Sequence, residues 1–524
     1  MKSKPVVQAP AQLNFAAHLL ALNADRGEKL AYIDDAGSLS YADLDLHVRR
    51  FAARLIDQGI RREERVLLCA HDTTDWPIAF LGCLYAGVVP VAVNTLLSAD
   101  DYAYMIEHCN ARGVIVSDAL LSTLQTAIGQ SSTKPALIIV SRASEAFAGG
   151  GLRLEQLLEE GSELEKPADT RRDDIAFWLY SSGSTGRPKG TVHTHGNLFA
   201  TQATYGTHAL GLTEEDVTFS AAKLFFAYGL GNALTFPLSA GATVCLMAER
   251  PTPEAVFKRL SEHKASVFFG VPTLYAGMLA GPMPDRDALS LRVCASAGEA
   301  LPKEIGERFE AHFGVPILDG IGSTEMLHIF LSNRVDELRY GTSGKPVPGY
   351  ELQLLDEDGT PVDDDTVGDL YVKGDSSALM YWGNRDKSRS TFLGAWTRTG
   401  DKYVRDSEGW YTYSGRSDDM LKVSGQYVSP FEVESCLMQH ESVFEAAMIG
   451  IHDDNGLVKS KAFVVLKPGV EASDTLAVEI KKFVKDRLAP HKYPRRIDFI
   501  AELPKTPTGK IQRFKLRQLE TAER

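Results

Sequence analysis

The chain has 524 residues, of which 44% are apolar and 24% charged, and its formal net charge is −13. This length exceeds a single ordinary hydrophobic core, so two to four domains are expected. The acidic balance argues against nucleic acid or an anionic membrane as the main partner, and no apolar run reaches the length of a bilayer span.

The N-terminus and the cysteines favour a cytoplasmic protein. The first residues, MKSKPVVQAPAQLN, lack the long apolar segment of a signal peptide. The six cysteines are scattered, mostly in apolar surroundings, and form no C-x-x-C pair. We therefore expect reduced thiols in the core rather than disulfides or zinc ligands.

The first third of the chain alternates between apolar strands and amphipathic helices. Ser40 is placed to cap a helix over 41–58, with Asp43 at the capping-box position. Short connections between the elements predict a parallel or mixed α/β sheet. The predicted helices span 15–22, 41–58, 75–86 and 100–108, and the predicted strands span 30–34, 65–70, 88–93, 114–116 and 136–140.

A segment rich in glycine and hydroxyl groups follows a predicted strand over 175–180. It is YSSGSTGRPKG, over residues 180–190. Glycines let successive backbone N–H groups point one way, and Arg187 and Lys189 add positive charge, so the segment suits a polyphosphate. A mobile Ser/Gly loop is the plainer interpretation. The segment is not a Walker A loop, because that motif needs a glycine where the chain has Pro188.

The alternation resumes after this segment and changes near residue 344. Helices are predicted over 197–209, 232–236, 253–263, 273–279 and 303–313, with strands over 217–221, 242–247, 266–270, 293–295 and 317–321. Strands over 350–355, 368–373 and 410–413 then indicate a small β-subdomain. Helices over 430–440, 474–488 and 513–519, with strands over 446–450, 462–466 and 496–499, indicate a compact α+β domain of about a hundred residues at the end.

Five further polar stretches stand out. Two follow predicted strands, where the carboxyl ends of an α/β sheet line a ligand crevice. Taken singly, each has a plain structural explanation, such as a turn or a solvated lysine, and His193 and His195 lack the spacing of metal ligands. The stretches are ASAGEA over 295–300, GIGSTE over 320–325, TGD in a predicted loop over 399–401, GRSDD over 415–419 and PKTPTGK over 504–510.

Five motifs taken together and in this order resemble the acyl-adenylate-forming superfamily, which contains acyl- and aryl-CoA synthetases. They are YSSGSTGRPKG, GIGSTE, TGD, GRSDDMLKVSGQYVSPFEVE and PKTPTGKIQR. The resemblance covers roughly residues 20–520, and within the superfamily the chain is most similar to benzoate–CoA ligases. It implies a large N-terminal domain over 1–417, with its β-subdomain at about 344–414. It also implies a small mobile C-terminal domain over 418–524, with the hinge at Asp418.

The resemblance implies a two-step reaction with ATP, Mg²⁺ and coenzyme A. Benzoate would attack the α-phosphate of ATP to give benzoyl-adenylate and pyrophosphate, and the coenzyme A thiol would then displace AMP. Lys510 and Glu325 match the catalytic residues, Glu325 also being the magnesium ligand. The residues that match the ATP and AMP contacts are Ser181, Ser182, Gly183, Ser184, Thr185, Gly186, Lys189, Gly298, Glu299, Asp319, Gly320, Ile321, Gly322, Ser323, Thr324, Asp401 and Arg416.

The residues that match the acyl pocket are Phe226, Ala227, Tyr228, Gly229, Ala297, Ile321, His328 and Ile329. They predict a small, flat and largely apolar slot, which suits an unsubstituted aromatic ring. No carboxylate lies in the segment from Lys223 to Phe226, which disfavours an amino-acid substrate. His328 either orients the substrate carboxylate or only walls the pocket. The residues expected to face coenzyme A are Ser424, Gly425, Gln426 and Tyr427.

Other activities of the same superfamily remain open. One alternative substrate is another small aryl acid, such as a hydroxy- or aminobenzoate, or a medium-chain acyl acid. Another activity is adenylation that loads a carrier protein, since it shares the first half-reaction. No nucleic-acid or membrane partner is expected, and a homodimer is left open.

Overall fold

The computed structural model describes residues 6–144, 151–159, 161–181, 187–417, 419–423, 426–452, 458–489, 492–505 and 511–522. Within these ranges no helix is both long and apolar enough to cross a membrane. The chain divides into two compact units. The first contains residues 1–352 and 372–398, and the second contains residues 353–371 and 399–524.

An eight-stranded sheet carries both ends of the segment over 180–190, which is called the polyphosphate segment below because its composition suits a polyphosphate. Its strand order is β19-β9-β8-β4-β3-β5-β6-β7, parallel from β8 to β7 and antiparallel at β9 and β19. The strands are β3 (Arg65–Cys69), β4 (Val89–Ala92), β5 (Gly113–Ser117), β6 (Leu137–Ser141), β7 (Leu152–Arg153), β8 (Ile175–Ser181), β9 (Lys189–Thr194) and β19 (Met380–Tyr381).

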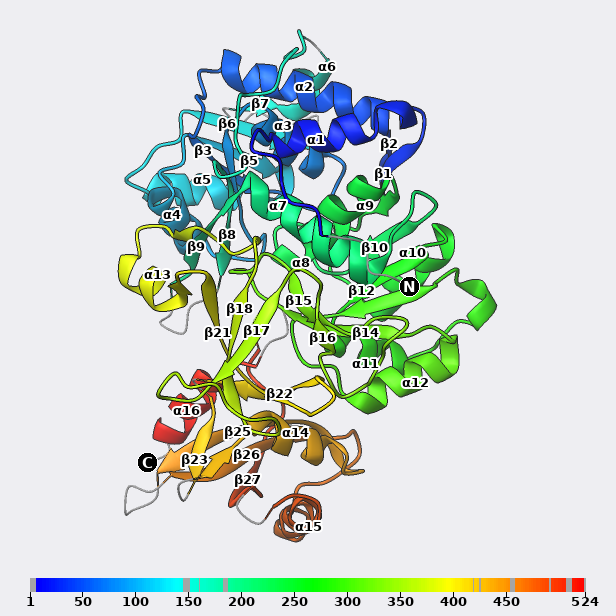
Figure 1. The fold of residues 1–524 in the computed structure, drawn as a ribbon, viewed down its shortest axis with the longest axis vertical. Helices are drawn as coiled ribbons and strands as arrows, with labels where there is room; N and C mark the ends of the chain where they lie inside the picture. The colour runs from blue at the N-terminus through cyan, green and yellow to red at the C-terminus, as the bar shows by residue number, and fades with distance from the viewer. Residues whose placement is uncertain are drawn as a thin grey trace. The chain divides into compact units, whose positions relative to one another are not determined.

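Helices cover both faces of this sheet (Figure 1). Side chains alternate along β3, so that Val66 and Leu68 pack with α1, α2 and α3, whereas Leu67 and Cys69 pack with α4 and α5. The predicted capping box is present at the start of α2, where Ser40 and Asp43 bond each other's backbone. The helices are α1 (Phe15–Leu22), α2 (Tyr41–Asp57), α3 (Asp75–Tyr85), α4 (Ala99–His108), α5 (Leu121–Gln130) and α6 (Leu154–Glu159).

A nine-stranded mixed sheet carries the rest of the predicted site in the first unit. Its order is β16-β15-β14-β13-β12-β10-β11-β1-β2, with parallel pairing from β14 to β1. The strands are β1 (Leu30–Asp34), β2 (Gly37–Ser40), β10 (Val217–Ser220), β11 (Thr243–Cys245), β12 (Val267–Gly270), β13 (Val293–Ser296), β14 (Ile317–Gly322), β15 (Ile329–Ser332) and β16 (Lys345–Pro346).

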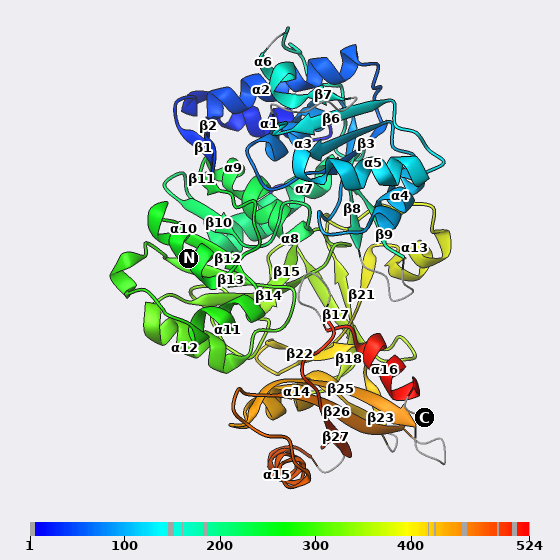
Figure 2. The same ribbon diagram turned by 180° about the vertical axis from the view of Figure 1, so that it is seen from behind.

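Helices α10 (Pro253–Glu262), α11 (Pro272–Ala280) and α12 (Lys303–Phe313) lie along this sheet (Figure 2). Two helices differ from the sequence prediction. The predicted helix over 197–209 begins earlier, as α7 (His195–Thr201), and ends as a π-helix (Gln202–Leu210). The predicted helix over 232–236 is the middle of a continuous helical stretch from α8 (Ala227–Leu230) through a π-helical segment (Gly231–Thr235) to α9 (Phe236–Ala240). π-Helical turns are frequent at functional sites.

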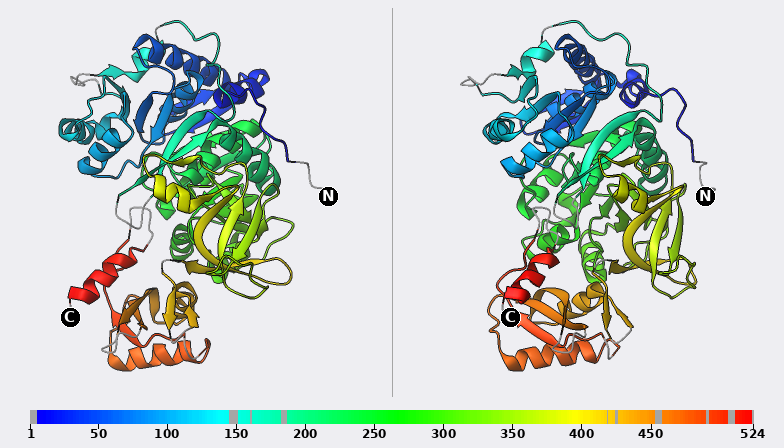
Figure 3. Two further views of the ribbon diagram at one scale, coloured as in Figure 1. Left: turned by 60° about the vertical axis from the view of Figure 1, so that its left-hand side comes forward. Right: turned by 90° about the vertical axis from the view of Figure 1, so that its left-hand side faces the viewer.

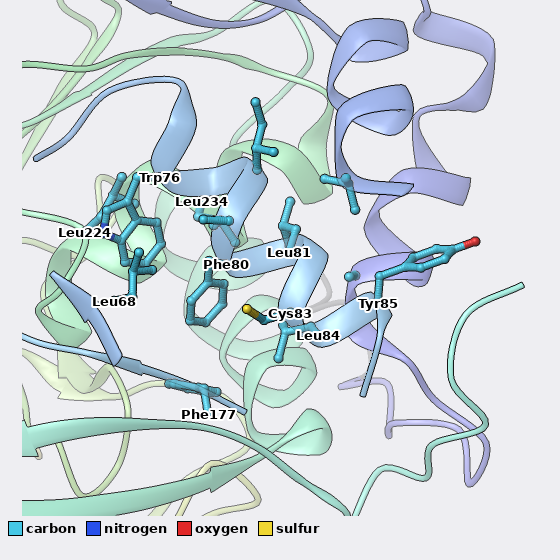
Figure 4. Close-up of a cluster of buried hydrophobic side chains, with 14 of the residues drawn as sticks. Leu68, Trp76, Phe80, Leu81, Cys83, Leu84, Tyr85, Phe177, Leu224 and Leu234 are labelled. Atoms are coloured by element: carbon cyan, nitrogen blue, oxygen red, sulfur yellow. The ribbon is translucent and has the colours of Figure 1, made fainter. Parts of the chain in front are cut away.

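The core of the first unit is organised around α3, whose eleven residues are all buried. Trp76 stacks on Phe80 with 5.0 Å between ring centroids, and Phe80 meets the edge of Phe177 on β8 (Figure 4). Leu224, at the start of the predicted acyl-pocket segment, belongs to the same cluster. Burial of such aromatic and aliphatic side chains contributes about 1.5–3 kcal/mol each. This packing connects the strand before the polyphosphate segment with the start of the acyl pocket.

The chain crosses between the two units inside β17 (Glu351–Leu355), β18 (Gly368–Lys373) and β21 (Trp396–Arg405). In the first unit, α13 (Arg385–Thr391) precedes β20 (Phe392–Leu393). In the second unit, β21 pairs with β22 (Tyr411–Arg416). The predicted domain limits at 417 and 418, the limits of the β-subdomain and the hinge remain predictions.

The end of the second unit is the predicted α+β fold. A three-stranded sheet, in the order β25-β26-β27, packs α14 and α15 on one face and α16 on the other (Figure 3). Its elements are β23 (Leu421–Val423), β24 (Gln426–Val428), α14 (Pro430–Met438), β25 (Val443–His452), β26 (Val458–Leu466), α15 (Asp474–Lys485), β27 (Arg496–Phe499) and α16 (Arg513–Ala522). The predicted fold class, an α/β body followed by a small α+β domain, is confirmed.

Candidate active site

Three predicted site residues meet at the end of β8, the start of β9 and the turn after β14. Ser181 closes β8 and faces Lys189, the first residue of β9, across the antiparallel pair. The Ser181 hydroxyl donates to Glu325 Oε1 at 3.3 Å, and Lys189 Nζ lies 3.9 Å from the same oxygen. Each of the Lys189 and Glu325 side chains is 16% exposed, so both charges remain accessible to a ligand.

Tyr381 also belongs to this cluster, and sequence reasoning missed it. Its hydroxyl donates to Glu325 Oε1 at 2.7 Å, and Lys189 Nζ lies 3.5 Å from the hydroxyl and 4.4 Å from the ring centroid. The tyrosine arrives on β19, a two-residue strand that pairs with β9. No local pattern could have indicated it, because this pairing joins segments about 190 residues apart in the chain.

The end of β14 and the turn after it contain consecutive half-exposed residues, from Ile321 to Glu325. The chain then reverses into the antiparallel strand β15. GIGSTE is therefore not an ordinary turn from a strand into a helix. Leu327 adopts a positive φ of 63°, a backbone conformation that is uncommon for a branched residue and often marks a functional site. The surrounding structure must therefore hold this turn in its uncommon conformation.

Buried hydrogen bonds hold this turn in place. His193 Nε2 lies 2.8 Å from the Thr324 carbonyl oxygen, and its Nδ1 lies 3.1 Å from Asn197 Oδ1. Burial lowers the pKa of His193 to about 4, so at neutral pH only one of these two nitrogens carries a proton to donate. The Ala378 amide donates to the Glu325 carbonyl at 2.7 Å. His193 is thus structural, as predicted, but it supports the turn that carries Glu325.

The predicted acyl-pocket segment is a tightly folded turn into α8. A Cβ on Gly229 would lie 2.0 Å from the Lys223 carbonyl oxygen, so only glycine fits there. The buried Asp72 carboxylate accepts the Leu224 amide at 3.2 Å, and burial raises the pKa of Asp72 to about 6. Lys223 Nζ donates to the Glu249 carbonyl at 2.7 Å. Asp72 and Lys223 therefore fix the start of the segment.

Aromatic rings surround His328. The centroids of Tyr205, Tyr228 and Phe236 lie 5.0, 5.5 and 4.6 Å from its ring. Burial lowers the pKa of His328 to about 3, so the ring is neutral near pH 7. Its Nε2 lies 3.2 Å from the Tyr228 carbonyl and from Asn232 Oδ1, which makes Nε2 the protonated nitrogen. Nδ1 is then an acceptor, which favours a wall residue over a carboxylate partner.

Several buried polar atoms beside these rings make no hydrogen bond of ordinary geometry to any described residue. They include the Tyr228 hydroxyl, Ser296 Oγ and Asp319 Oδ1. Ser296 and Asp319 lie opposite each other on β13 and β14. Burial raises the pKa of Asp319 well above its usual range, which favours the protonated acid. Unpartnered buried polar groups are costly, and a bound polar molecule would relieve that cost.

Several residues predicted as ATP and AMP contacts lie at the ends of β13 and β14. Ala297 is buried, whereas Gly298 is exposed with a φ of +95° and a Cβ there would meet no atom within 4 Å. Glu299 is half-exposed. Of the other residues predicted for the acyl pocket, Phe226 is half-buried, and Ala227 and Ile329 are buried.

Asp401 and Arg416 lie together in the second unit, directly opposite each other on β21 and β22. Arg416 Nη1 donates to Asp401 Oδ1 at 2.9 Å and to the Thr399 carbonyl at 3.2 Å. The prediction of a loop over 399–401 was wrong, because these residues continue β21. The glycine and threonine suggested a turn, but Gly400 adopts a φ of +76° within the strand, and the Asp401 amide bonds Thr399 Oγ1.

Some predicted site residues lie outside the described residues. They are Ser182, Gly183, Ser184, Thr185, Gly186, Asp418, Ser424, Gly425 and Lys510. Gln426 and Tyr427 are described as backbone of β24, which pairs with β23. Among the described side chains no group of three His, Cys, Asp or Glu residues could hold a metal ion.

The six cysteines are free and buried, as predicted. Burial raises the pKa of all six thiols.

Known proteins match this chain almost end to end. A family model described as AMP-binding enzyme matches residues 21–382, and one described as AMP-binding enzyme C-terminal domain matches residues 432–510. A benzoate–CoA ligase from Thauera aromatica is 55% identical over 98% of the chain and 97% of its own length. A 4-hydroxybenzoate–CoA/benzoate–CoA ligase from Rhodopseudomonas palustris is 47% identical over 94% and 91%.

A solved structure agrees with these sequence matches. The crystal structure of a benzoate CoA ligase from Burkholderia xenovorans superposes with a TM-score of 0.90 at 59% identity, covering 96% of the chain and all of that structure. Because the match covers 96% of the chain, it includes both the α/β body and the small α+β domain. The chain therefore belongs to the AMP-binding enzymes, the acyl-adenylate-forming superfamily that its ordered motifs predicted.

Proposed function

We propose that this chain is a benzoate–CoA ligase that forms benzoyl-adenylate from benzoate and ATP, and then benzoyl-CoA. The observation that carries the proposal is the 55% identity to the Thauera aromatica benzoate–CoA ligase over 98% of the chain. The site geometry supports it, because cationic, hydroxyl and carboxylate groups meet beside an aromatic pocket. The reaction takes place in the cytoplasm, a reducing compartment that suits six buried free thiols.

In the first step a benzoate oxygen attacks the α-phosphorus of ATP. The new P–O bond replaces the bond to the β-phosphate oxygen, and pyrophosphate leaves. Because benzoate is already ionised, the step needs charge neutralisation more than a general base. Ser181 and Lys189 contact the β- and γ-phosphates at the end of β8 and the start of β9. Lys510 contributes positive charge near the α-phosphate.

Magnesium is the metal that this superfamily resemblance implies, and the residues present fit it. Ser181, Tyr381 and Lys189 all contact Glu325 through Oε1. A hard cation bound by one protein carboxylate and by nucleotide oxygens is ordinary for Mg²⁺. Glu325 would hold the ion, which supplies charge neutralisation for the phosphates.

In the second step the coenzyme A thiolate sulfur attacks the acyl carbon of benzoyl-adenylate. The C–S bond forms, the C–O bond to the phosphate breaks, and AMP leaves. Asp401 holds the ribose hydroxyls, since a buried carboxylate can accept both O–H donors, and Arg416 orients that carboxylate at 2.9 Å. Residues Ser424 to Tyr427 face the pantetheine chain.

The pocket favours a flat aromatic acid. Phe226, Ala227, Ile329 and the neutral ring of His328 offer an apolar surface that matches an unsubstituted phenyl group. A long acyl chain would need a tunnel lined by small residues. The half-buried Phe226 and the rings around His328 are not small residues of this kind.

A ring-hydroxylated benzoate is the second candidate substrate. The observation that favours it is the buried Tyr228 hydroxyl, which makes no hydrogen bond of ordinary geometry to any described residue. A hydroxyl on the substrate ring would supply one, and such a partner can decide between substrates by large factors. A relative named for both 4-hydroxybenzoate and benzoate is 47% identical to the chain.

A panel of carboxylic acids tests the proposal. Benzoate, the hydroxy- and aminobenzoates and medium-chain fatty acids are each supplied with ATP, Mg²⁺ and coenzyme A, and AMP and thioester are quantified. Benzoate should give the highest kcat/KM. Adenylate without thioester would instead indicate an enzyme that loads a carrier protein, and a higher kcat/KM for a fatty acid would overturn the aryl assignment.

A further inference from the structure

The contacts of Tyr381 suggest a role that depends on the proposed function, at the same site. Among the described residues, Glu325 Oε1 has three polar neighbours: Ser181 Oγ at 3.3 Å, Lys189 Nζ at 3.9 Å and the Tyr381 hydroxyl at 2.7 Å. The tyrosine contact is the shortest of the three, and a hydrogen bond to a carboxylate is a strong one. Tyr381 therefore restrains Glu325 more tightly than Lys189 does.

The backbone holds Tyr381 in place from two sides. Its strand pairs with β9, with Tyr381 opposite Thr191, and the Trp382 amide donates to the Gly190 carbonyl at 2.8 Å. Three residues earlier, the Ala378 amide donates to the Glu325 carbonyl at 2.7 Å. The segment from 378 to 382 is thus bonded both to the strand that starts with Lys189 and to the turn that carries Glu325.

Lys189 and Tyr381 respond differently to an incoming triphosphate. Lys189 has a long flexible side chain, and phosphate oxygens compete with Glu325 for its charge. Tyr381 has a rigid ring with only two rotatable side-chain bonds, is 3% exposed, and sits on a backbone that is bonded on both sides. The tyrosine hydroxyl, 2.7 Å from Glu325 Oε1, is therefore the partner that can stay with the carboxylate when the lysine turns toward phosphates.

We propose that Tyr381 is a positioning residue that keeps the Glu325 carboxylate oriented for the cation of Mg²⁺–ATP while Lys189 transfers from Glu325 to the phosphates. The hydroxyl donates its one proton to Oε1, so the second carboxylate oxygen is directed toward the nucleotide. Tyr381 then acts only through Glu325, and only in the half-reaction that uses ATP. Thioester formation from preformed benzoyl-adenylate does not need it.

The variant Tyr381→Phe tests this role by calorimetry of ATP binding, with no benzoate present. With Mg²⁺, the dissociation constant of ATP should rise about tenfold, the effect of losing one hydrogen bond to a charged group. With the metal chelated, the variant and the parent protein should bind ATP equally. An equal loss with and without Mg²⁺, or no loss, would overturn the proposal.

Two further variants control the experiment. Tyr41→Phe removes another buried tyrosine hydrogen bond, from the Tyr41 hydroxyl to the Ala242 carbonyl at 2.6 Å, outside the predicted site, and should leave ATP binding unchanged. Adding Tyr381→Phe to Glu325→Gln should cost no more than Glu325→Gln alone, because the tyrosine acts through the carboxylate. Additive losses would contradict the proposal, and thermal unfolding of each variant checks that it is folded.

The readouts separate this inference from the proposed function. ATP binding requires neither benzoate nor coenzyme A, so it tests Tyr381 whatever acid the enzyme uses. Benzoyl-CoA formation by the parent protein tests the substrate alone. Normal benzoyl-CoA formation with unaltered Mg²⁺–ATP binding in Tyr381→Phe would therefore refute only the role of Tyr381.

Discussion

At the scale of single residues, Phe226 and Tyr228 dominate the expected recognition of the substrate ring. Truncating either to alanine should raise the KM for benzoate far more than the KM for ATP, because only the acyl pocket loses contact area. The loss of one aromatic contact corresponds to about tenfold or more in KM. Steady-state kinetics with each substrate varied in turn measures the effect. An unchanged benzoate KM would place the pocket elsewhere.

His195 makes stability depend on pH. Its Nδ1 accepts the Phe15 amide at 3.3 Å, and burial lowers its pKa to about 4, although the Asp174 carboxylate opposes this shift. The unfolded chain, with a histidine pKa near 6.5, therefore binds more protons than the folded chain between pH 6.5 and 4. The contribution is fully present above pH 6.5 and is lost as the pH falls.

The variant His195→Asn should weaken that dependence, since an amide oxygen can accept the same N–H and does not titrate. Between pH 6.5 and 5, the free energy of unfolding of the parent protein should fall by about 2 kcal/mol more than that of the variant. Urea unfolding at the two pH values measures the difference. Parallel losses in both proteins would show that His195 is not a titrating group.

Individual residues also show the limit of sequence reasoning. Ser181, Lys189 and Glu325 were predicted as site residues because they lie in distinctive motifs, and the fold brings the first two within 4 Å of Glu325 Oε1. Tyr381 and Asp72 have no motif of their own. Tyr381 reaches Glu325 through a strand pairing, and Asp72 reaches Leu224 across 152 residues of chain. Contacts of this kind follow from the tertiary fold, which local spacing does not encode.

At the scale of elements, helix α4 supports both ends of the polyphosphate segment. The Tyr104 hydroxyl donates to the Pro188 carbonyl at 3.1 Å, and the Arg187 guanidinium lies 5.0 Å from the centre of the same ring. One turn later, His108 Nδ1 lies 2.9 Å from the Tyr180 hydroxyl. One face of α4 thus contacts the chain on both sides of the segment.

Replacing Tyr104 by leucine should therefore weaken ATP binding without affecting the acyl pocket. It removes a hydrogen bond and a cation–π contact, each of about 0.5–1.5 kcal/mol, so the KM for ATP should rise roughly threefold to tenfold. The KM for benzoate should not change. Tyr104→Phe is the matched control, because it keeps the ring and loses only the hydroxyl. Equal effects of leucine and phenylalanine would rule out a contribution from Arg187 stacking.

Elements with strong local signals were predicted well. Helix α2 begins at its predicted capping box, and α12 and β27 have the predicted limits. The strands β15 and β19 were missed, and β21 was missed where a loop was expected. β19 has only two residues, and β15 is a fully buried run too short to show alternation. Such strands are defined by the neighbours that they pair with.

At the scale of the whole molecule, the two half-reactions require different parts of the chain. Lys510→Ala should lower the rate of benzoyl-adenylate formation by roughly a hundredfold or more, because the positive charge near the α-phosphate is lost. Thioester formation from preformed benzoyl-adenylate and coenzyme A should be largely retained. Separate assays of pyrophosphate release and of thioester formation make the comparison. Equal losses in both would contradict the assignment of Lys510 to adenylation alone.

The family and the order of layers could be predicted from the sequence because five motifs occur in a fixed order along it. The division into compact units could not. Residues 353–371 group with the C-terminal part of the chain, and residues 372–398 group with the N-terminal part. The strands β18 and β21 pass from one unit to the other, so no composition change or flexible linker marks the transition.

The burial of every cysteine has a practical consequence for spectroscopy and enzyme assays. All six thiols are shielded in the folded protein, and burial raises the pKa of each. A thiol-reactive chromophore added to a reaction mixture should therefore report the consumption of free coenzyme A with little background from the enzyme. For the same reason, one surface cysteine introduced into each unit would be the preferred attachment point for a pair of fluorophores, and energy transfer between them could follow the catalytic cycle in real time.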